Sequence, residues 1–419
     1  MRSKLPRTFA VMQLVLVVGF GACGPAKAGS QPAPVQVGVQ VLLRDSLGLV
    51  RGKRVGLITN QTGVFRAADG RIVSDIDTLY HHPDVDLVAL FSPEHGIRGT
   101  ARGGASIAGA TDSATGLPIH SLYGATRVPT PEMLAAIDVL LFDIQDIGTR
   151  YYTYVWTMAH AMEAAARDSI PFVVLDRPDP IGGTLVQGNV QDTAHLSFVG
   201  LYLVPMRHGM TAGELAGLLN DAYGIGARLD VVPMQGWKRS EWYDDTGLAW
   251  VAPSPNMPSL ESATHYPGTC LFEGTNLSVG RGTDRAFQQI GAPWLDNQAI
   301  KADMNALGLP GVRFEAVEFT PAHPGDDKYD GQPVRGIRLI TTDRSAYDPT
   351  TAAVALLVDI QRRQGDRLAW RASHFDRLAG NGRLRTMVQA GATVAAITAP
   401  WAGQLAAFRK LRQQYLLYP

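Results

Sequence analysis

Three acidic residues directly follow short apolar runs, and they are the first candidates for chemistry. Glu94 follows one run, between Pro93 and a His-Gly pair, and Asp143 and Asp146 end another. Proline stiffens the chain before Glu94, and the glycine two positions later lets it turn. A carboxyl group held in such a loop, partly shielded from water, suits a general acid. The alternative is a loop carboxylate that only accepts hydrogen bonds from backbone amides.

The two aspartates allow several kinds of chemistry. Asp143 and Asp146 can bind sugar hydroxyls, hold a metal ion or act as a base. Arg150 follows Asp146 by four residues. It either neutralises that carboxylate or binds an acidic substrate.

A second group of charged residues lies between positions 266 and 284, where glycine is frequent. Glu273, Asn276, Arg281 and Asp284 supply an acid, an amide, a cation and a second acid. Glycine allows the backbone to approach a ligand closely. Arg281 can form a bidentate pair with a substrate carboxylate. An internal ion pair between Arg281 and Asp284 explains the pattern equally well.

Short apolar runs that end at polar residues predict the strands that position these groups. The runs cover 54–60, 86–92, 138–143 and 171–176. Helical periodicity separates them, and the clearest helices are predicted over 154–167 and 212–223. The alternation predicts an α/β fold with a Rossmann-like, doubly wound, mostly parallel sheet. Ligands bind beyond the carboxyl ends of such strands, so we expect Asn60, Glu94, His95 and Asp143 at one edge.

The composition changes after about residue 237. The stretch 253–294 is rich in Pro, Gly, Asn, Ser and Thr and carries few helix or strand signals. Asn256 lies in its stiff, proline-flanked start, which would form a wall of the pocket. Strand and helix patterns return over 336–341, 351–363 and 401–415. We therefore predict an N-terminal domain over 37–260 and a smaller α+β domain over 261–419, with the Gly/Pro-rich stretch at their interface.

The N-terminus has the pattern of an export signal. Basic residues precede an apolar run over 9–20, and small residues then lead to Cys23. The lipoprotein signal peptidase recognises that pattern, so Cys23 would become the lipidated first residue. Ordinary signal-peptide cleavage after Ala28 is the alternative. Both cleavage sites predict an extracytoplasmic protein. It would be periplasmic or a membrane-anchored lipoprotein, and secretion is the alternative.

The composition excludes several classes of protein. The 419 residues include 38 Lys and Arg and 38 Asp and Glu, whereas a nucleic-acid-binding surface needs a basic excess. Two cysteines and scattered histidines favour neither a disulfide framework nor a zinc site. The sequence lacks a serine elbow, a phosphate-binding loop and a dinucleotide fingerprint. It therefore predicts no cofactor and no metal. Acidic and aromatic residues remain, which are the groups that carbohydrate-active enzymes use.

Six motifs, taken together, resemble the DUF1343 family, which includes exo-β-N-acetylmuramidases of the NamZ type. They lie at 56–63, 91–99, 142–150, 208–211, 255–258 and 266–284. The resemblance runs from about residue 40 to the C-terminus. It implies a Rossmann-like domain, a second α/β domain and a cleft between them. It also implies release of terminal N-acetylmuramic acid from peptidoglycan fragments, with Glu94 as the best catalytic candidate and with His208 in a matching motif.

The resemblance leads to a specific hypothesis for catalysis. Glu94 would protonate the leaving oxygen, and Glu273, Asp143 or Asp146 would act as the second carboxylate. The 2-acetamido group of the substrate could replace that carboxylate. Arg281 or Arg150 would bind the lactyl carboxylate. The rival functions are a non-catalytic cell-wall-binding lipoprotein and a hydrolase of another bond in wall sugars.

Overall fold

The N-terminal half of the chain is built on a seven-stranded sheet in the order β11-β8-β7-β1-β4-β6-β5. We analysed a computed structural model, which describes residues 1, 34–94, 96–97 and 110–419. The strands of the sheet are β1 (Arg54–Thr59), β4 (Asp86–Ser92), β5 (Ala110–Thr111), β6 (Pro118–Ser121), β7 (Val139–Asp143), β8 (Phe172–Leu175) and β11 (Leu229–Val232). All neighbours pair in parallel except β5 with β6. This sheet confirms the predicted fold class, and β1, β4, β7 and β8 are the four predicted strands.

Helices cover both faces of this sheet, which explains why its strands are continuous apolar runs. Leu57 on β1 and Leu141 on β7 pack on one face with α1 (Gly38–Asp45) and α2 (Asp75–Tyr80). Ile58 and Phe142, the next residue on each strand, pack on the other face. That face is covered by α3 (Pro131–Leu134), α4 (Tyr154–Arg167) and α5 (Ala212–Asp221). The alternation of side chains along each strand thus separates two apolar cores. Two hairpin-like pairs complete this half: β2 (Val64–Arg66) with β3 (Ile72–Ser74), and β9 (Gln187–Val190) with β10 (Pro205–Arg207).

Helix α5 begins with the predicted capping box. The Thr211 hydroxyl accepts a hydrogen bond from the Glu214 amide (3.2 Å), and the Glu214 carboxylate accepts one from the Thr211 amide (3.1 Å). The same hydroxyl donates to Asp176 Oδ2 (2.7 Å), just after β8. Thr211 therefore joins the start of α5 to the carboxyl end of the sheet.

Replacing Thr211 with alanine should destabilise the protein measurably. We expect Thr211→Ala to lower the free energy of unfolding by about 1–3 kcal/mol, because the helix loses its cap and Asp176 loses a buried donor. Thr211→Ser keeps the hydroxyl and should recover most of the loss. Urea unfolding of the three proteins measures the difference. Equal stability of the alanine and serine variants would contradict this role.

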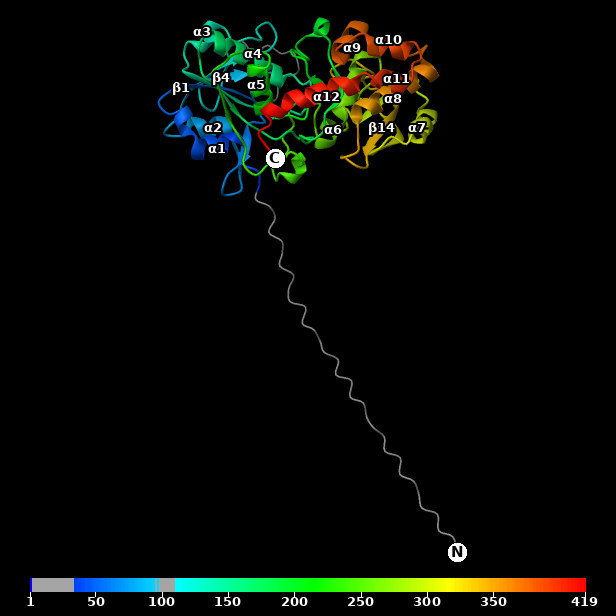
Figure 1. Ribbon diagram of the computed structural model, residues 1–419, viewed down its shortest axis with the longest axis horizontal. Helices are drawn as coiled ribbons and strands as arrows, with labels where there is room; N and C mark the ends of the chain where they lie inside the picture. The colour runs from blue at the N-terminus through cyan, green and yellow to red at the C-terminus, as the bar shows by residue number, and fades with distance from the viewer. Residues whose placement is uncertain (2–33, 95, 98–109) are drawn as a thin grey trace. The chain divides into compact units, whose positions relative to one another are not determined.

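The C-terminal half is an antiparallel sheet surrounded by helices. Its strands are β12 (Gln289–Ala292), β13 (Val312–Phe319) and β14 (Val334–Thr341), in the order β12-β14-β13. The helices are α6 (Leu260–Thr269), α7 (Asn297–Ala306), α8 (Pro349–Gln364), α9 (Ala372–Ala379), α10 (Arg383–Gln389), α11 (Val394–Thr398) and α12 (Trp401–Arg412). The structure corrects one expectation: the stretch 253–294 contains both α6 and β12. In Figure 1, β1 and β4 lie at one end of the described unit, and α7 and β14 lie at the other.

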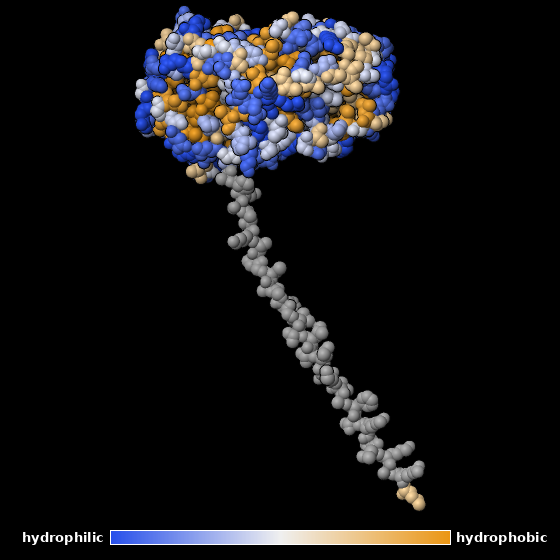
Figure 2. All heavy atoms as spheres, viewed as in Figure 1, coloured by the Kyte–Doolittle hydropathy of each residue, from blue (hydrophilic) through white to orange (hydrophobic). Residues whose placement is uncertain are grey.

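The last helix, α12, runs from the C-terminal half back to the N-terminal half and ends near α5 (Figure 1). The Arg412 guanidinium, near the end of α12, donates to the carbonyl oxygens of Gly183 (3.1 Å) and His208 (3.0 Å). Beyond α12, the Tyr418 hydroxyl donates to Asp176 Oδ2 (2.6 Å). Residues 34–419 accordingly form one compact unit. The division at 260/261 stays a prediction. Hydrophilic residues dominate the rim of this unit in Figure 2, with hydrophobic areas between them.

Candidate active site

A cavity of about 760 Å³ lies where the loops after β4 and before α4 meet the C-terminal half. From the N-terminal half it is lined by Glu94, Tyr151, Tyr152, Thr153, Tyr154, Val199, Ser254, Asn256 and Met257. From the C-terminal half it is lined by Tyr266, Cys270, Glu273, Arg281, Phe287, His323, Asp327, Asp330, His374 and Leu378. Four of the predicted site residues therefore share one cavity: Glu94, Asn256, Glu273 and Arg281. A volume of this size accommodates a small saccharide.

Glu94 is half-buried at the wall of this cavity. It follows the end of β4 by two residues, and Gly96 turns the chain with φ +79°, as the sequence predicted. Glu94 Oε2 accepts a hydrogen bond from the hydroxyl of Thr153, directly before α4 (2.9 Å). The carboxyl group also lies near Tyr123, and burial together with the charge of Glu94 raises the pKa of that phenol to about 12. These partners fix Glu94 at the edge of the sheet while it borders the cavity.

Glu273 and Arg281 form an ion pair on the opposite, C-terminal part of the cavity. Arg281 Nε lies 2.7 Å and Nη2 lies 2.5 Å from Glu273 Oε1. Burial alone would raise the pKa of Glu273, but the charge and hydrogen bonds of Arg281 outweigh it and lower that pKa. Glu273 is therefore an anion at neutral pH. Arg281 pairs with Glu273, whereas Asp284 is exposed and lies 4.0 Å from Arg285, so the alternative of an Arg281–Asp284 ion pair is not what the structure shows.

A buried lysine supports the backbone that carries this pair. Lys328 Nζ donates to the carbonyl oxygens of Glu273 (3.2 Å) and Leu277 (3.0 Å). Burial lowers the pKa of Lys328 to about 8, although Asp326 and Glu273 act in the opposite direction. The lysine thereby fixes the loop that joins Glu273 to Arg281.

Aromatic rings form the wall between the two charged groups. Tyr152 packs edge-on against Tyr154 and Tyr266, with ring centroids 5.0 and 5.9 Å apart. Tyr266 in turn packs against Phe287 at 4.6 Å. Burial raises the pKa of the Tyr152 phenol, so it stays protonated and able to donate. Aromatic faces and protonated hydroxyls are the surfaces that sugar rings and their hydroxyls contact.

Asp143 lies at the expected edge of the sheet, but its partners are other protein groups. Both of its carboxylate oxygens bind the Arg177 guanidinium, and both residues are buried. The Thr59 hydroxyl bonds the Asp143 carbonyl oxygen (2.9 Å) and Asp75 Oδ2 (2.6 Å). The structure therefore places Asp143 in a buried network beneath the sheet edge and not among the residues that line the cavity.

Asp146 and His208 are buried together behind the cavity. The carboxylate oxygen Oδ2 of Asp146 accepts a hydrogen bond from the Gly148 amide (2.8 Å) and lies 4.0 Å from His208 Nε2. Burial raises the pKa of Asp146 to about 8 and lowers the pKa of His208 to about 3. Both groups are therefore largely uncharged at neutral pH. Neither lines the cavity, so their predicted roles in catalysis and substrate binding gain no support from this placement.

Asp146→Asn should change how stability depends on pH. The pKa of Asp146 is higher in the folded protein than in the unfolded chain. The protonated carboxyl group therefore contributes fully to stability below about pH 4, and this contribution is lost as the pH rises towards 8. Asparagine imitates the protonated form. As the pH rises through this window, we expect the free energy of unfolding of the variant to increase relative to the wild type by up to about 1.4 kcal/mol for each pH unit. Urea unfolding at pH 5, 6.5 and 8 measures the gain.

Asp138 provides a control of opposite sign. Hydrogen bonds from Arg54 lower the pKa of Asp138 to about 2. Asp138→Asn should therefore be less stable than the wild type at neutral pH, and the difference should shrink as the pH falls from 4 to 2. Parallel pH curves for Asp146→Asn and the wild type would contradict the assigned pKa of Asp146.

Three further predicted residues hold the protein backbone. The buried guanidinium of Arg150 donates to the carbonyl oxygens of Asn189 (2.8 Å) and Leu378 (3.0 Å), which ties the two halves together. Asn276 bonds the backbone of residues 367 and 369, at 2.9 and 3.0 Å. Asn60 accepts hydrogen bonds from the amide (2.9 Å) and the hydroxyl (2.6 Å) of Thr62. None of the three lines the cavity, and His95 and Cys23 lie outside the described residues.

Several cavity residues were not predicted. Tyr151, Tyr152 and Tyr154 surround Thr153 in one aromatic run at the start of the helix predicted over 154–167. That run is visible in the sequence, so it could have indicated an aromatic wall of the site. His374 and His323 come from loops and helices with no local signature. Across the described ranges 34–94, 96–97 and 110–419, no group of three or more His, Cys, Asp or Glu side chains is arranged to hold a metal ion.

The site has the features of a carbohydrate hydrolase. An aromatic-walled cavity holds one half-buried carboxyl group, a second carboxylate kept ionised, and a fixed arginine. A pair of carboxyl groups that differ in environment is what glycosidases use to cleave a glycosidic bond. The fold and the site thus define a glycosidase-like α/β protein.

Comparison with known proteins agrees with this class. Residues 55–261 match the N-terminal and residues 264–418 the C-terminal family model of the exo-β-N-acetylmuramidase NamZ. The chain belongs to the NamZ family. It is 46% identical over 385 residues to the peptidoglycan β-N-acetylmuramidase NamZ of Bacillus subtilis, covering 92% of this chain and 91% of that protein.

Solved structures of two DUF1343 family proteins from Bacteroides fragilis share the fold. One is 38% identical with a TM-score of 0.84, and the other is 30% identical with a TM-score of 0.73. Each alignment covers 92% of this chain and 99% of the other. The predicted family and fold are confirmed.

Proposed function

We infer that this protein is an exo-β-N-acetylmuramidase, a glycosidase that releases N-acetylmuramic acid from the non-reducing ends of peptidoglycan fragments. The near-full-length similarity to the Bacillus subtilis enzyme supports the activity. The observation that ties the activity to this chain is the cavity in which Glu94 and Arg281 both lie. An acid and a fixed cation in one pocket match a sugar that carries a carboxylate. The activity assigns the protein to turnover of the cell wall.

In the proposed mechanism, Glu94 is the general acid. Its proton passes to the glycosidic oxygen as the bond to C1 of the muramic acid breaks, and water then completes the hydrolysis. Glu273 is the second carboxylate, because Arg281 keeps it ionised and it borders the same cavity. An anion there stabilises the positive charge that develops on the sugar ring. Asp143 and Asp146 lack access to the cavity and are the weaker candidates.

Arg281 accounts for the choice of sugar. Its Nε and Nη2 atoms face Glu273 Oε1, and the guanidinium fork carries further N–H donors for a substrate carboxylate. The lactyl carboxylate distinguishes N-acetylmuramic acid from N-acetylglucosamine. Asn256, in the wall of the cavity, is positioned to bond the sugar hydroxyls or the acetamido group.

Incubation with a defined disaccharide tests the function. The purified protein should release free N-acetylmuramic acid from N-acetylmuramyl-β-1,4-N-acetylglucosamine, detected by liquid chromatography with mass spectrometry. The reversed disaccharide, with N-acetylglucosamine at the non-reducing end, should stay intact. Binding of the first disaccharide without release would favour a wall-binding protein. Cleavage of an ester or amide in wall fragments, with the glycosidic bond intact, would favour another hydrolase.

We further propose that the protein works outside the cytoplasm and is anchored through a lipid on Cys23. The apolar run before Cys23 supports this placement. Across the described residues, no helix is long and apolar enough to cross a membrane. In cells grown with labelled palmitate, the wild type should carry label and fractionate with membranes. Cys23→Ala should lose the label, and an unlabelled wild type cleaved after Ala28 would indicate soluble export.

A further inference from the structure

A cationic side chain is held on an aromatic ring whose sequence neighbour, Val199, lines the cavity. The Arg127 guanidinium lies over the ring of Phe198, 4.5 Å from the ring centroid, and Arg127 is exposed. The His160 ring, on α4, is parallel to Phe198 within 5° at a centroid distance of 5.9 Å. Stacking on an aromatic face restricts an arginine and leaves its N–H edges free to bind.

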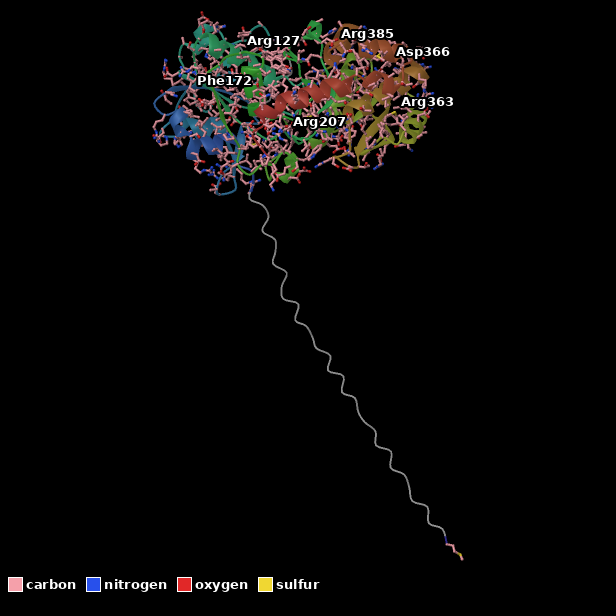
Figure 3. All side chains as sticks on the ribbon, in the orientation of Figure 1. Arg127, Phe172, Arg207, Arg363, Asp366 and Arg385 are labelled. Carbon is pink, nitrogen blue, oxygen red and sulfur yellow. The ribbon has the colours of Figure 1, made fainter. Side chains whose placement is uncertain are left out.

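Phe198 and Tyr123 link this arginine to the wall of the cavity. Val199, next to Phe198, lines the cavity. The ring centroids of Tyr123 and Phe198 lie 6.5 Å apart, and the charge of Glu94 acts on the Tyr123 phenol. Figure 3 places Arg127 close to α4 on the upper edge of the N-terminal half, towards the C-terminal half. The order of neighbours is thus Glu94, Tyr123, Phe198 and Arg127.

That order gives the two sides of the cleaved bond different positions. The terminal muramic acid occupies the cavity between Arg281 and Glu94. The leaving part of the substrate must extend from Glu94 in the other direction, past Tyr123, because the acid protonates the oxygen between the two parts. In an alternating peptidoglycan chain, the first leaving sugar is N-acetylglucosamine and carries no acid. The next sugar is a second muramic acid, whose lactyl group carries a carboxylate.

We infer that Arg127, fixed by Phe198, binds the lactyl carboxylate of this second muramic acid, two sugars beyond the terminal one. The inference rests on the proposed function and deepens it: chains of three or more sugars are preferred to the disaccharide. A charge-assisted hydrogen bond at a partly exposed arginine supports a modest gain, about threefold to tenfold in kcat/KM. Arg127 is a specificity-determining residue that takes no part in the chemical step.

Two substrates and two variants test this inference. The disaccharide MurNAc-GlcNAc ends before Arg127, and the trisaccharide MurNAc-GlcNAc-MurNAc reaches it. The wild type should cleave the trisaccharide about threefold to tenfold more efficiently, and Arg127→Gln should abolish that advantage while leaving disaccharide cleavage within twofold. Arg127→Lys keeps the charge and should retain part of the advantage. Arg313→Gln, at an exposed arginine of β13, is the matched control and should leave the cleavage efficiency on both substrates unchanged.

A chemically altered trisaccharide separates charge from chain length. Amidation of the lactyl carboxylate on the third sugar should reduce wild-type cleavage to the level of the disaccharide. An unchanged trisaccharide advantage in Arg127→Gln, or an equal loss on both substrates, would overturn the role of Arg127. Failure to release N-acetylmuramic acid even from the disaccharide would instead overturn the proposed function.

Discussion

Glu94→Gln should lower kcat on the natural disaccharide by about 10²–10⁴-fold, which is the usual contribution of a general acid. Glutamine keeps an oxygen for the Thr153 hydroxyl, so the loop should hold its shape, but the side chain has no proton to give. KM should change little, because binding depends on the aromatic wall and on Arg281. Steady-state kinetics of released N-acetylmuramic acid measure both constants.

The leaving group provides the control for this role. A β-muramide with an activated aryl leaving group needs little protonation, so the loss in Glu94→Gln should be much smaller on that substrate. Glu318→Gln, at an exposed position of β13, should behave as the wild type on both substrates. Near-wild-type turnover of Glu94→Gln on the disaccharide would remove Glu94 from the role of acid.

Arg281→Gln should have the second largest effect. Removing one partner of a hydrogen-bonded charge pair that the substrate desolvates costs about 2–5 kcal/mol, so we expect kcat/KM on the disaccharide to fall by roughly 30-fold or more. Arg281→Lys keeps a positive charge but lacks the planar fork that binds Glu273 and a substrate carboxylate together. It should recover only part of the loss. The measurement is kcat/KM with the folded fraction checked by thermal unfolding.

Selectivity distinguishes a binding role of Arg281 from a structural one. The wild type should prefer the disaccharide with a free lactyl carboxylate to the same disaccharide with that carboxylate amidated. In Arg281→Gln the two substrates should be cleaved at similar rates, because no cation distinguishes them. Arg285→Gln removes an exposed neighbouring arginine and should keep the wild-type preference. A preference that survives in Arg281→Gln would mean that another group binds the carboxylate.

The parts of the fold with strong local patterns could be predicted. Strands β1, β4, β7 and β8 are continuous apolar runs covered on both faces, and α4 and α5 show clear helical periodicity with a capping box on α5. Helix α6 could not be predicted, because it contains Pro267 and Gly268, which weaken helices. A tertiary contact explains the glycine in this helix, because a Cβ on Gly268 would lie 1.9 Å from the Pro349 carbonyl oxygen. Close packing against α8 thus selects glycine inside a helix.

The candidate site could be predicted only in part for a similar reason. Glu94 and Asp143 both follow strands at the same edge, yet only Glu94 borders the cavity. The partner of Asp143 is Arg177, 34 positions later, and the sequence does not reveal that pairing. Arg281 and Glu273 were both predicted, but their ion pair was not, because a nearer carboxylate at Asp284 competes in any argument from spacing. Long-range pairing therefore decides which polar residues remain open to a ligand.

The return of α12 to the N-terminal half places residues 418–419 against the carboxyl end of the large sheet. Tyr418 is 9% exposed and covers Asp176, and the backbone oxygen of Pro419 accepts a hydrogen bond from the Arg239 amide (2.9 Å). Replacing Tyr418 with phenylalanine would therefore leave the buried carboxyl group of Asp176 one donor short. The integrity of the glycosidase thus depends on residues far from its chemistry.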